Sequence, residues 1–256
     1  MNKFKPLIDL DKVRAFVSMS TITLTCKINT EFYVLNIFKH MPLIKNRIVT
    51  IKYGDDKIRT LIPIKKKQRK TTKRKKLFLN QVTLVVKTDP KRLLNIKLFR
   101  NGSLQITGCK NFEHFANDIT IMFDEIIKTI KVADTTIEFV RNPELMNISS
   151  IHEFAIRMIN CNFNAGFEID RCLLYYSLRT NNINAIYDSC THASVNIKYN
   201  KDGIVSSLFV FESGCVIITG ITTVEQLIDT YNFITEYFNN NYNKIVKINI
   251  IDFMQV

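Results

Sequence analysis

Patterns that would identify an enzyme or a metal protein are missing from this sequence. It has no Walker loop, no H-E-x-x-H and no G-x-S-x-G. The six cysteines never form a C-x-x-C pair, which argues against a zinc ribbon, and Cys190-Thr191-His192 is only a weak metal motif. We therefore expect no enzyme activity, no metal and no other cofactor. The four histidines lie in unrelated contexts: His40, His114, His152 and His192.

Long apolar runs are absent as well. No stretch of about 18 apolar residues occurs, so the sequence predicts no membrane span. Asp9 and Asp11 interrupt the short apolar run at the start, and we expect no signal peptide. The scattered cysteines suit a reducing compartment. These features favour a protein that works inside a cell.

Positive charge, by contrast, is abundant. Lys and Arg number 36 against 23 Asp and Glu, which gives a formal net charge of +13. Such an excess destabilises a compact chain unless a polyanion uses it, and it favours nucleic acid as the partner. The alternative is a merely soluble basic protein. Hydrophobic residues make up 46% of the 256 residues, enough for a real core in one large domain or two half-domains.

Part of the charge lies in one run of twelve residues, 65–76, of which nine are basic. A block of this kind repels itself and is typical of a loosely held segment. Three interpretations stay open: a solvated loop, an arm that binds phosphates, and a nuclear-import signal. The basic residues of the run are Lys65, Lys66, Lys67, Arg69, Lys70, Lys73, Arg74, Lys75 and Lys76.

One stretch occurs twice in the chain. Residues 96–108 read I-K-L-F-R-N-G-S-L-Q-I-T-G, and residues 208–220 read L-F-V-F-E-S-G-C-V-I-I-T-G, at an offset of 112 residues. Glycine tolerates the positive φ of a tight turn, so each copy predicts two strands joined at Gly102 or Gly214. A helical pattern follows each copy, and then I-E-F or I-D-F, so a whole structural unit is repeated.

Periodicity predicts an α+β fold with the order strand, helix, four strands, helix in each half. Strands joined by short turns pair antiparallel, and helices then cover one face of the sheet and leave the other bare. Thr30 and Thr222 or Thr223 are the expected N-caps. Strands are expected at 13–28, 47–53, 77–87, 92–100, 135–144, 154–163, 182–188 and 194–199 and in both hairpins, and helices at 31–41, 111–130, 169–178 and 223–240.

The twofold pattern of an aliphatic residue, Phe, two residues, Gly and a strand ending in Thr-Gly resembles the TATA-box-binding protein family. The resemblance is to the divergent copies of large DNA viruses, and it covers both halves of the chain. It implies two pseudo-repeats, residues 1–133 and residues 134–256. It also implies that they form a curved antiparallel sheet, a saddle, with helices on the convex face. The basic run 65–76 is an insertion that the family lacks.

Alternation along the strands assigns side chains to the bare face of each hairpin. An apolar sheet face left exposed is unusual and indicates a binding surface, although core packing is the alternative for its phenylalanines. The residues expected on this face are Lys97, Phe99, Gln105 and Thr107 in the first copy, and Phe209, Phe211, Ile217 and Thr219 in the second.

The resemblance adds roles to these residues. It implies that Phe99 and Phe211 wedge between base steps in the minor groove and bend the duplex, and that Thr107 and Thr219 contact the groove. Lys110 matches a phosphate-binding lysine, and Phe78 matches a second wedge. The second repeat has no Phe at that place, where His192 or its neighbours stand instead.

Together these features predict a general transcription initiation factor. It would bind AT-rich double-stranded promoter DNA and help to recruit RNA polymerase with a protein resembling transcription factor IIB. The alternative is a scaffold, either sliding-clamp-like or devoted to protein interactions, that contacts DNA only electrostatically. The expected location is the nucleus or the viral cytoplasmic factory of an infected cell.

Overall fold

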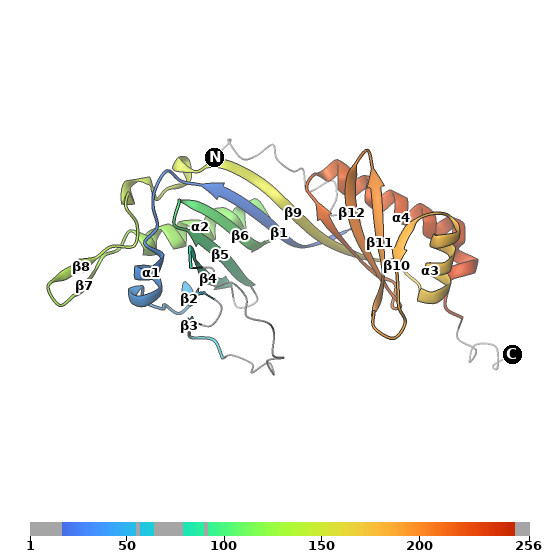
Figure 1. Cartoon of the computed structure of the whole chain (residues 1–256), viewed down its shortest axis with the longest axis horizontal. Helices are drawn as coiled ribbons and strands as arrows, with labels where there is room; N and C mark the ends of the chain where they lie inside the picture. Colours follow the sequence, from blue (N-terminus) through green and yellow to red (C-terminus); the bar gives the residue numbers. More distant parts are fainter. Residues whose placement is uncertain (1–16, 55–56, 64–78, 90–91, 249–256) are drawn as a thin grey trace. The chain divides into compact units, whose positions relative to one another are not determined.

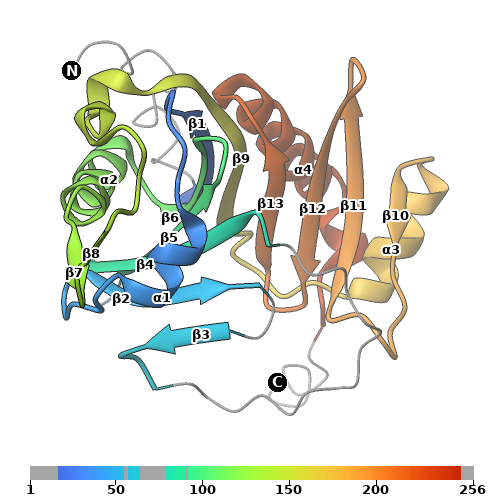
Figure 2. The ribbon, with the colours of Figure 1, turned by 60° about the vertical axis from the view of Figure 1, so that its left-hand side comes forward.

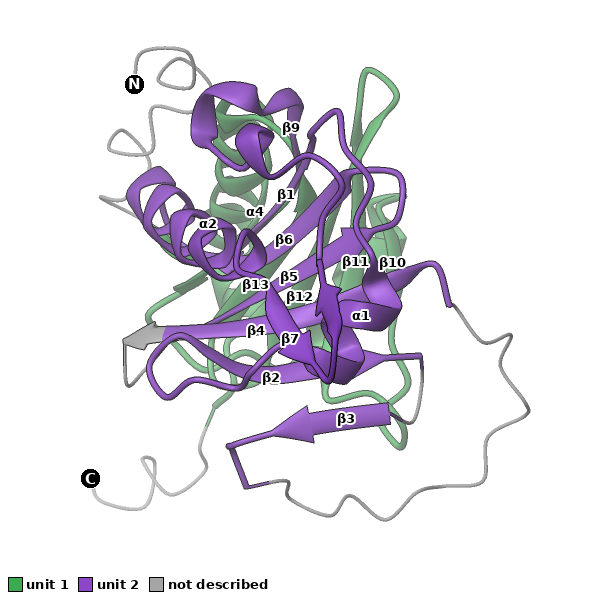
Figure 3. Ribbon diagram, turned by 90° about the vertical axis from the view of Figure 1, so that its left-hand side faces the viewer, with its two compact units in different colours: residues 1–21, 158–256 green, residues 22–157 purple. Residues whose placement is uncertain are grey.

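The computed structural model describes residues 17–54, 57–63, 79–89 and 92–248. By its internal contacts the chain forms two compact units: unit 2 contains residues 22–157, and unit 1 contains residues 1–21 and 158–256 (Figure 3). Strands β1 (Ser18–Lys27) and β9 (His152–Asn164) each contribute residues to both units. The division of the repeats at residue 133 stays a prediction.

Unit 2 is an antiparallel sheet with helices packed on it. The strands lie in the order β1, β6, β5, β4, β2, β3. Helix α2 contacts β4 and β6, and α1 contacts β2 and β4 (Figure 3). The elements are α1 (Val34–His40), β2 (Ile48–Tyr53), β3 (Lys57–Thr60), β4 (Gln81–Asp89), β5 (Arg92–Phe99), β6 (Ser103–Cys109), α2 (Phe112–Ile126), β7 (Ile130–Val132) and β8 (Thr135–Ile137).

Unit 1 repeats this plan. Its strands lie in the order β9, β13, β12, β11, β10, all paired antiparallel (Figures 1 and 2). Helix α4 contacts β13, and α3 contacts α4, β10 and β11. The elements are α3 (Arg171–Thr180), β10 (Asn184–Ile186), β11 (Ser194–Lys201), β12 (Ile204–Phe211), β13 (Cys215–Ile221) and α4 (Val224–Ile245).

Local sequence explains where three of the helices begin. The residue just before each of α2, α3 and α4 is an N-cap with an extended backbone: Asn111, Asp170 and Thr223. Each of these side chains accepts a hydrogen bond from a backbone N–H in the first turn of its helix. Thr223 is therefore the cap expected for the last helix. Thr30 is not a cap, because α1 starts after Tyr33 and the Thr30 hydroxyl accepts instead from the backbone of Asn142.

The α+β class and the antiparallel hairpins are confirmed, but further expectations were wrong. The strand expected at 135–144 ends at Ile137, and a 3-10 helix spans Pro143–Leu145. Strand β3 was missed, because its four residues carry no alternating apolar pattern. The helix expected to run to Ile130 stops at Ile126, and Ile130 begins the β7–β8 hairpin. The positive φ of Ala133, 52°, turns that hairpin. The I-D-F motif at 251–253 lies outside the described residues.

Burial alternates along the strands of both units. In each hairpin the residues that face the helices are fully buried, and those that face away are partly exposed. We call the face that turns away from the helices the open face of each unit. The buried set of the two hairpins comprises Leu94, Ile96, Leu98, Leu104 and Ile106 in unit 2, and Leu208, Val210, Val216 and Ile218 in unit 1.

Candidate nucleic-acid interface

The open face of unit 2 is polar and basic. Register places Lys97 of β5 between Gln105 of β6 and Thr83 of β4. The same line of side chains continues to Thr25 of β1 on one side and to the exposed Lys52 of β2 on the other. We call these five residues the basic row. Arg157 of β9 donates from its Nε to the Thr25 hydroxyl over 2.8 Å, so a further cation lies at the end of this row.

The open face of unit 1 is largely apolar at the corresponding places. Phe209 of β12 pairs with Ile217 of β13 and Asn196 of β11. The line continues to Asn162 of β9 and to Ile186 of β10, whose side chain is 54% exposed. We call these five residues the apolar row. The Asn162 amide donates to the Ser20 hydroxyl over 2.9 Å.

Phe99 and Phe211 stand at the turn end of the two hairpins. Phe99 pairs with Gln81 and Phe211 with Ser194, and both rings are half-buried on the open face of their unit. A hollow of about 590 Å³ adjoins Phe99. Its walls are formed by Glu31, Asn80, Phe99, Arg100 and Asn101.

A second row of each open face contains the threonines singled out by the sequence. Thr107 lies between Thr23 of β1 and Asn95 of β5. Thr219 pairs with Ser207 of β12 and donates to the Asn160 amide oxygen over 2.5 Å. Lys198 continues the row of unit 1, and its ammonium donates to the Ser207 hydroxyl over 2.6 Å. Hydroxyl and amide groups thus lie beside each other on the open face of each unit.

Thr23 and Asn160 occupy corresponding positions, and neither is evident from the sequence. A register shift occurs between Ile22 and Thr23, and another occurs in β13 between Ile218 and Ile221. Each shift changes which residues face the same way, so simple counting along the strand fails there.

The remaining predicted residues fall outside these rows. Lys110 is exposed between β6 and α2, and Thr222 is exposed at the corresponding place in unit 1. Phe78 and the basic run 65–76 lie outside the described residues, so the structure gives no account of them. His192 is exposed at the start of β11; its carbonyl, together with that of Ala193, accepts from the Arg171 guanidinium.

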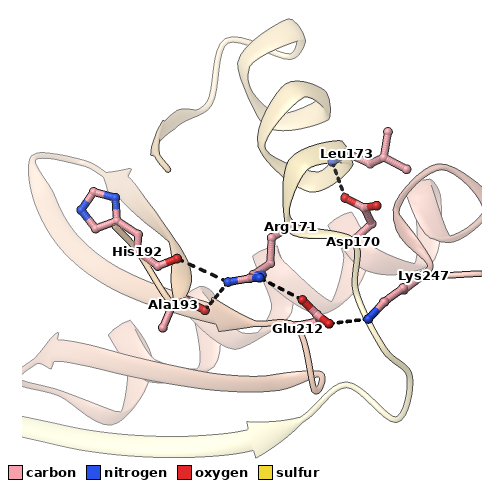
Figure 4. Close-up of polar contacts among 7 residues, drawn as sticks. All are labelled: Asp170, Arg171, Leu173, His192, Ala193, Glu212 and Lys247. Carbon is pink, nitrogen blue, oxygen red and sulfur yellow. Dashed lines mark hydrogen bonds and ion pairs between the residues drawn. The ribbon is translucent and has the colours of Figure 1, made fainter. Parts of the chain in front are cut away.

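An ion cluster fixes the turn end of the second hairpin. The Glu212 carboxylate, directly after Phe211, accepts from the Lys247 ammonium and from the Arg171 guanidinium, the latter over 2.9 Å (Figure 4). Lys247 and Arg171 together hold the pKa of Glu212 below its usual value, and the carboxylate raises the pKa of Lys247. Figure 4 shows the His192 ring pointing away from this cluster. Arg171 therefore links the start of α3 both to the residues just before β11 and to Glu212 just after β12.

Metal-ligating groups and cysteine thiols are the remaining groups of chemical interest in the described part of the chain. No group of three or more metal-ligating side chains occurs there. Cys26, Cys109 and Cys161 are buried on strands of the two sheets, and burial raises the pKa of each thiol to about 12, so they stay protonated at neutral pH. No helix within the described ranges is long and apolar enough to cross a membrane.

Comparison with known proteins gives one sequence relative. The chain is 37% identical over 251 residues to a protein of Acanthamoeba polyphaga mimivirus named TATA-box-binding protein-like. The alignment covers 90% of this chain, which spans 66% of that relative's own length. No family model matches the chain.

A solved structure shows the same fold. Methanococcus jannaschii TBP superposes with a TM-score of 0.54, over 88% of this chain and 98% of that chain, at 14% sequence identity. At this identity the likeness concerns the fold alone. It confirms the fold class expected from the repeated hairpin.

Proposed function

We propose that this chain, a divergent relative of the TATA-box-binding proteins similar to a viral copy, is a DNA-binding transcription initiation factor. The open face of each unit would bind DNA. The observation that carries the proposal is the pair of bare sheet faces: each presents hydroxyl or amide groups beside a half-buried phenylalanine at the hairpin end. Soluble proteins seldom leave such a face uncovered unless a partner occupies it.

The minor groove of AT-rich duplex DNA suits this chemistry. Its floor offers the acceptors N3 of adenine and O2 of thymine without an amino group, so threonine hydroxyls and asparagine amides can donate to it. Phe99 and Phe211 would enter a base step and unstack it, which bends the duplex. The excess of positive charge, +13 over the whole chain, supplies attraction to the phosphates.

In this role the chain needs no cofactor and catalyses no reaction. It positions RNA polymerase on promoters together with a protein resembling transcription factor IIB, in the nucleus or in the viral cytoplasmic factory of an infected cell. Outer surfaces of the units would meet those partners. A scaffold that touches DNA only through charge is the second candidate, and the basic composition favours it as well.

DNA bending separates the two candidates. Donor and acceptor dyes on the ends of a short AT-rich duplex should show increased energy transfer when the protein binds. Phe99→Ala and Phe211→Ala should each weaken that change, because the wedge is lost. A control, Phe167→Ala, removes a ring that packs on Phe238 and Tyr242 away from the open face, and it should leave the bend intact.

The opposite result would be tight binding without a bend, unaffected by either wedge substitution. It would leave a basic protein that holds DNA electrostatically, and it would rule out the wedge mechanism. Circular dichroism of each variant is needed to show that the sheets remain folded.

A further inference from the structure

The two open faces differ most along the basic row and the apolar row. Lys97 in unit 2 corresponds to Phe209 in unit 1, because the repeat offset of 112 residues and the strand pairings both relate them. At the next position Gln105 corresponds to Ile217. At a third position the exposed Lys52 of β2 corresponds to the exposed Ile186 of β10, although the edge strand of unit 2 is β3, where the exposed Ile58 pairs with Lys52. Three positions that are basic or polar in one unit are therefore apolar in the other.

The lysines of the basic row are available to a partner. Within the described ranges neither Lys52 nor Lys97 forms an ion pair with a carboxylate. Their neighbours along the row, Thr83 and Gln105, are neutral hydrogen-bonding groups. An ammonium in this setting attracts phosphate oxygens, and it displaces the counterions condensed on DNA when it binds.

The apolar row has the opposite character. Phe209 and Ile217 are half-buried and adjacent, and Ile186 adds an exposed aliphatic side chain at the sheet edge. These groups gain nothing from phosphates. They gain free energy only when an apolar surface, such as deoxyribose or an unstacked base, removes them from water. Lys198, a cation of the adjacent row, is held by the Ser207 hydroxyl.

We propose that the two units divide the work of DNA binding between them. The basic row of unit 2 contacts phosphates and carries the salt-dependent part of the affinity. The apolar row of unit 1 packs against sugar and base surfaces, and carries a salt-independent part together with distortion of the duplex. This inference rests on the proposed function and assigns a different chemistry to the open face of each unit.

Salt titration tests the division. The affinity of the full chain for a short AT-rich duplex is measured from about 50 to about 300 mM NaCl, together with end-to-end energy transfer. Lys52→Gln combined with Lys97→Gln should weaken the salt dependence of the affinity. The negative slope of log K against log salt should become less steep by about 0.9 for each phosphate that is no longer neutralised, and the bend should be kept. Phe209→Gln combined with Ile186→Gln should leave the slope unchanged and reduce both the bend and the affinity, the latter by about tenfold or more.

A charge-matched control removes two exposed lysines elsewhere, Lys131 of β7 and Lys244 of α4, by substitution with Gln. Its slope should equal that of the wild type. An equal fall in slope for the control and the basic-row variant would overturn the division, because charge alone would then matter. An apolar-row variant that binds and bends DNA like the wild type would also overturn it, and would assign that row to a protein partner.

Failure of the proposed function gives a different result. A folded wild-type chain that binds no duplex at any salt concentration contradicts both the function and the division. A wild-type chain that binds and bends DNA, while both double variants change the slope alike, contradicts the division alone. Thermal unfolding of all variants shows whether weaker binding reflects a loss of structure.

Discussion

Gly102 and Gly214 hold corresponding places in the two hairpin turns, and both are enclosed by backbone. Their φ angles are +83° and +79°, in the region that only glycine adopts readily. A Cβ on Gly102 would lie 2.1 Å from the Ile28 carbonyl oxygen, and one on Gly214 would lie 2.3 Å from that of Phe167. Their own carbonyls accept from the N–H groups of Ile28 and Ala165. Each turn is thus fastened to the segment that follows the first strand of its unit.

Alanine at either turn should therefore be costly. We expect Gly214→Ala to lower the free energy of unfolding by about 3 kcal/mol or more, because φ strain and displaced backbone add. Gly166→Ala is the matched control: its φ is +87°, but nothing lies within 4 Å of the added Cβ, so strain of about 1 kcal/mol is expected alone. Urea unfolding measures both. If both variants lose the same free energy of unfolding, the contact between the added Cβ of residue 214 and the Phe167 carbonyl oxygen does not contribute.

At the scale of elements, the Glu212 cluster joins the turn end of β12 to α3 and to the segment after α4. Because its partners hold the pKa of Glu212 below the usual value, its stabilisation is present above about pH 4.5 and is lost as the pH falls through the lower folded pKa. Glu212→Gln should thus lower Tm by roughly 1–3 °C at about pH 6, and by less at about pH 3.

Differential scanning calorimetry between about pH 3 and about pH 6 checks this expectation. Glu236→Gln, at an exposed position on α4, is the control and should shift Tm little at either pH. A Glu212→Gln deficit that is equal at the two ends of this pH range would mean that packing of the side chain, rather than its charge, stabilises the cluster.

The elements also show how far sequence reasoning reaches. Both hairpins, the helices after them and the side chains on the open face of each hairpin could be predicted, because glycine turns fix the register and alternation then assigns the faces. Thr23 and Asn160 could not be predicted, since the strand register shifts beside them, where β1 pairs with β6 and where β9 pairs with β13. Where the register shifts, the backbone geometry decides which residues of neighbouring strands share a face, and the residue pattern does not show this geometry.

At the scale of the whole molecule, the proposal that the basic run 65–76 is a phosphate-binding arm can be tested by removing its charge. Replacing its nine basic residues with serine would change the formal net charge from +13 to +4, since nine positive charges are removed. Counterion release then predicts a lower salt slope, by about 0.9 for each phosphate that the run neutralises, and a weaker affinity for any duplex. At saturating protein concentration, energy transfer between the ends of the AT-rich duplex should still show the bend. The proposed wedges and groove contacts lie on the open faces and are not changed in this variant.

Comparing an AT-rich with a GC-rich duplex makes this result decisive. If the run is a phosphate-binding arm, its replacement weakens both affinities by the same factor and the preference for AT-rich DNA is kept, since phosphates carry no sequence information. If the variant without the basic run no longer bends DNA, the proposal that the sheet faces recognise and bend the duplex is contradicted, and the electrostatic scaffold is favoured. Unchanged affinities, with loss of nuclear entry by a fluorescent fusion, would identify the run as an import signal. Under the proposed function, charge distributed over the chain and the chemistry of its sheet faces would thus make separable contributions, the first to how strongly DNA is bound and the second to which DNA is bent.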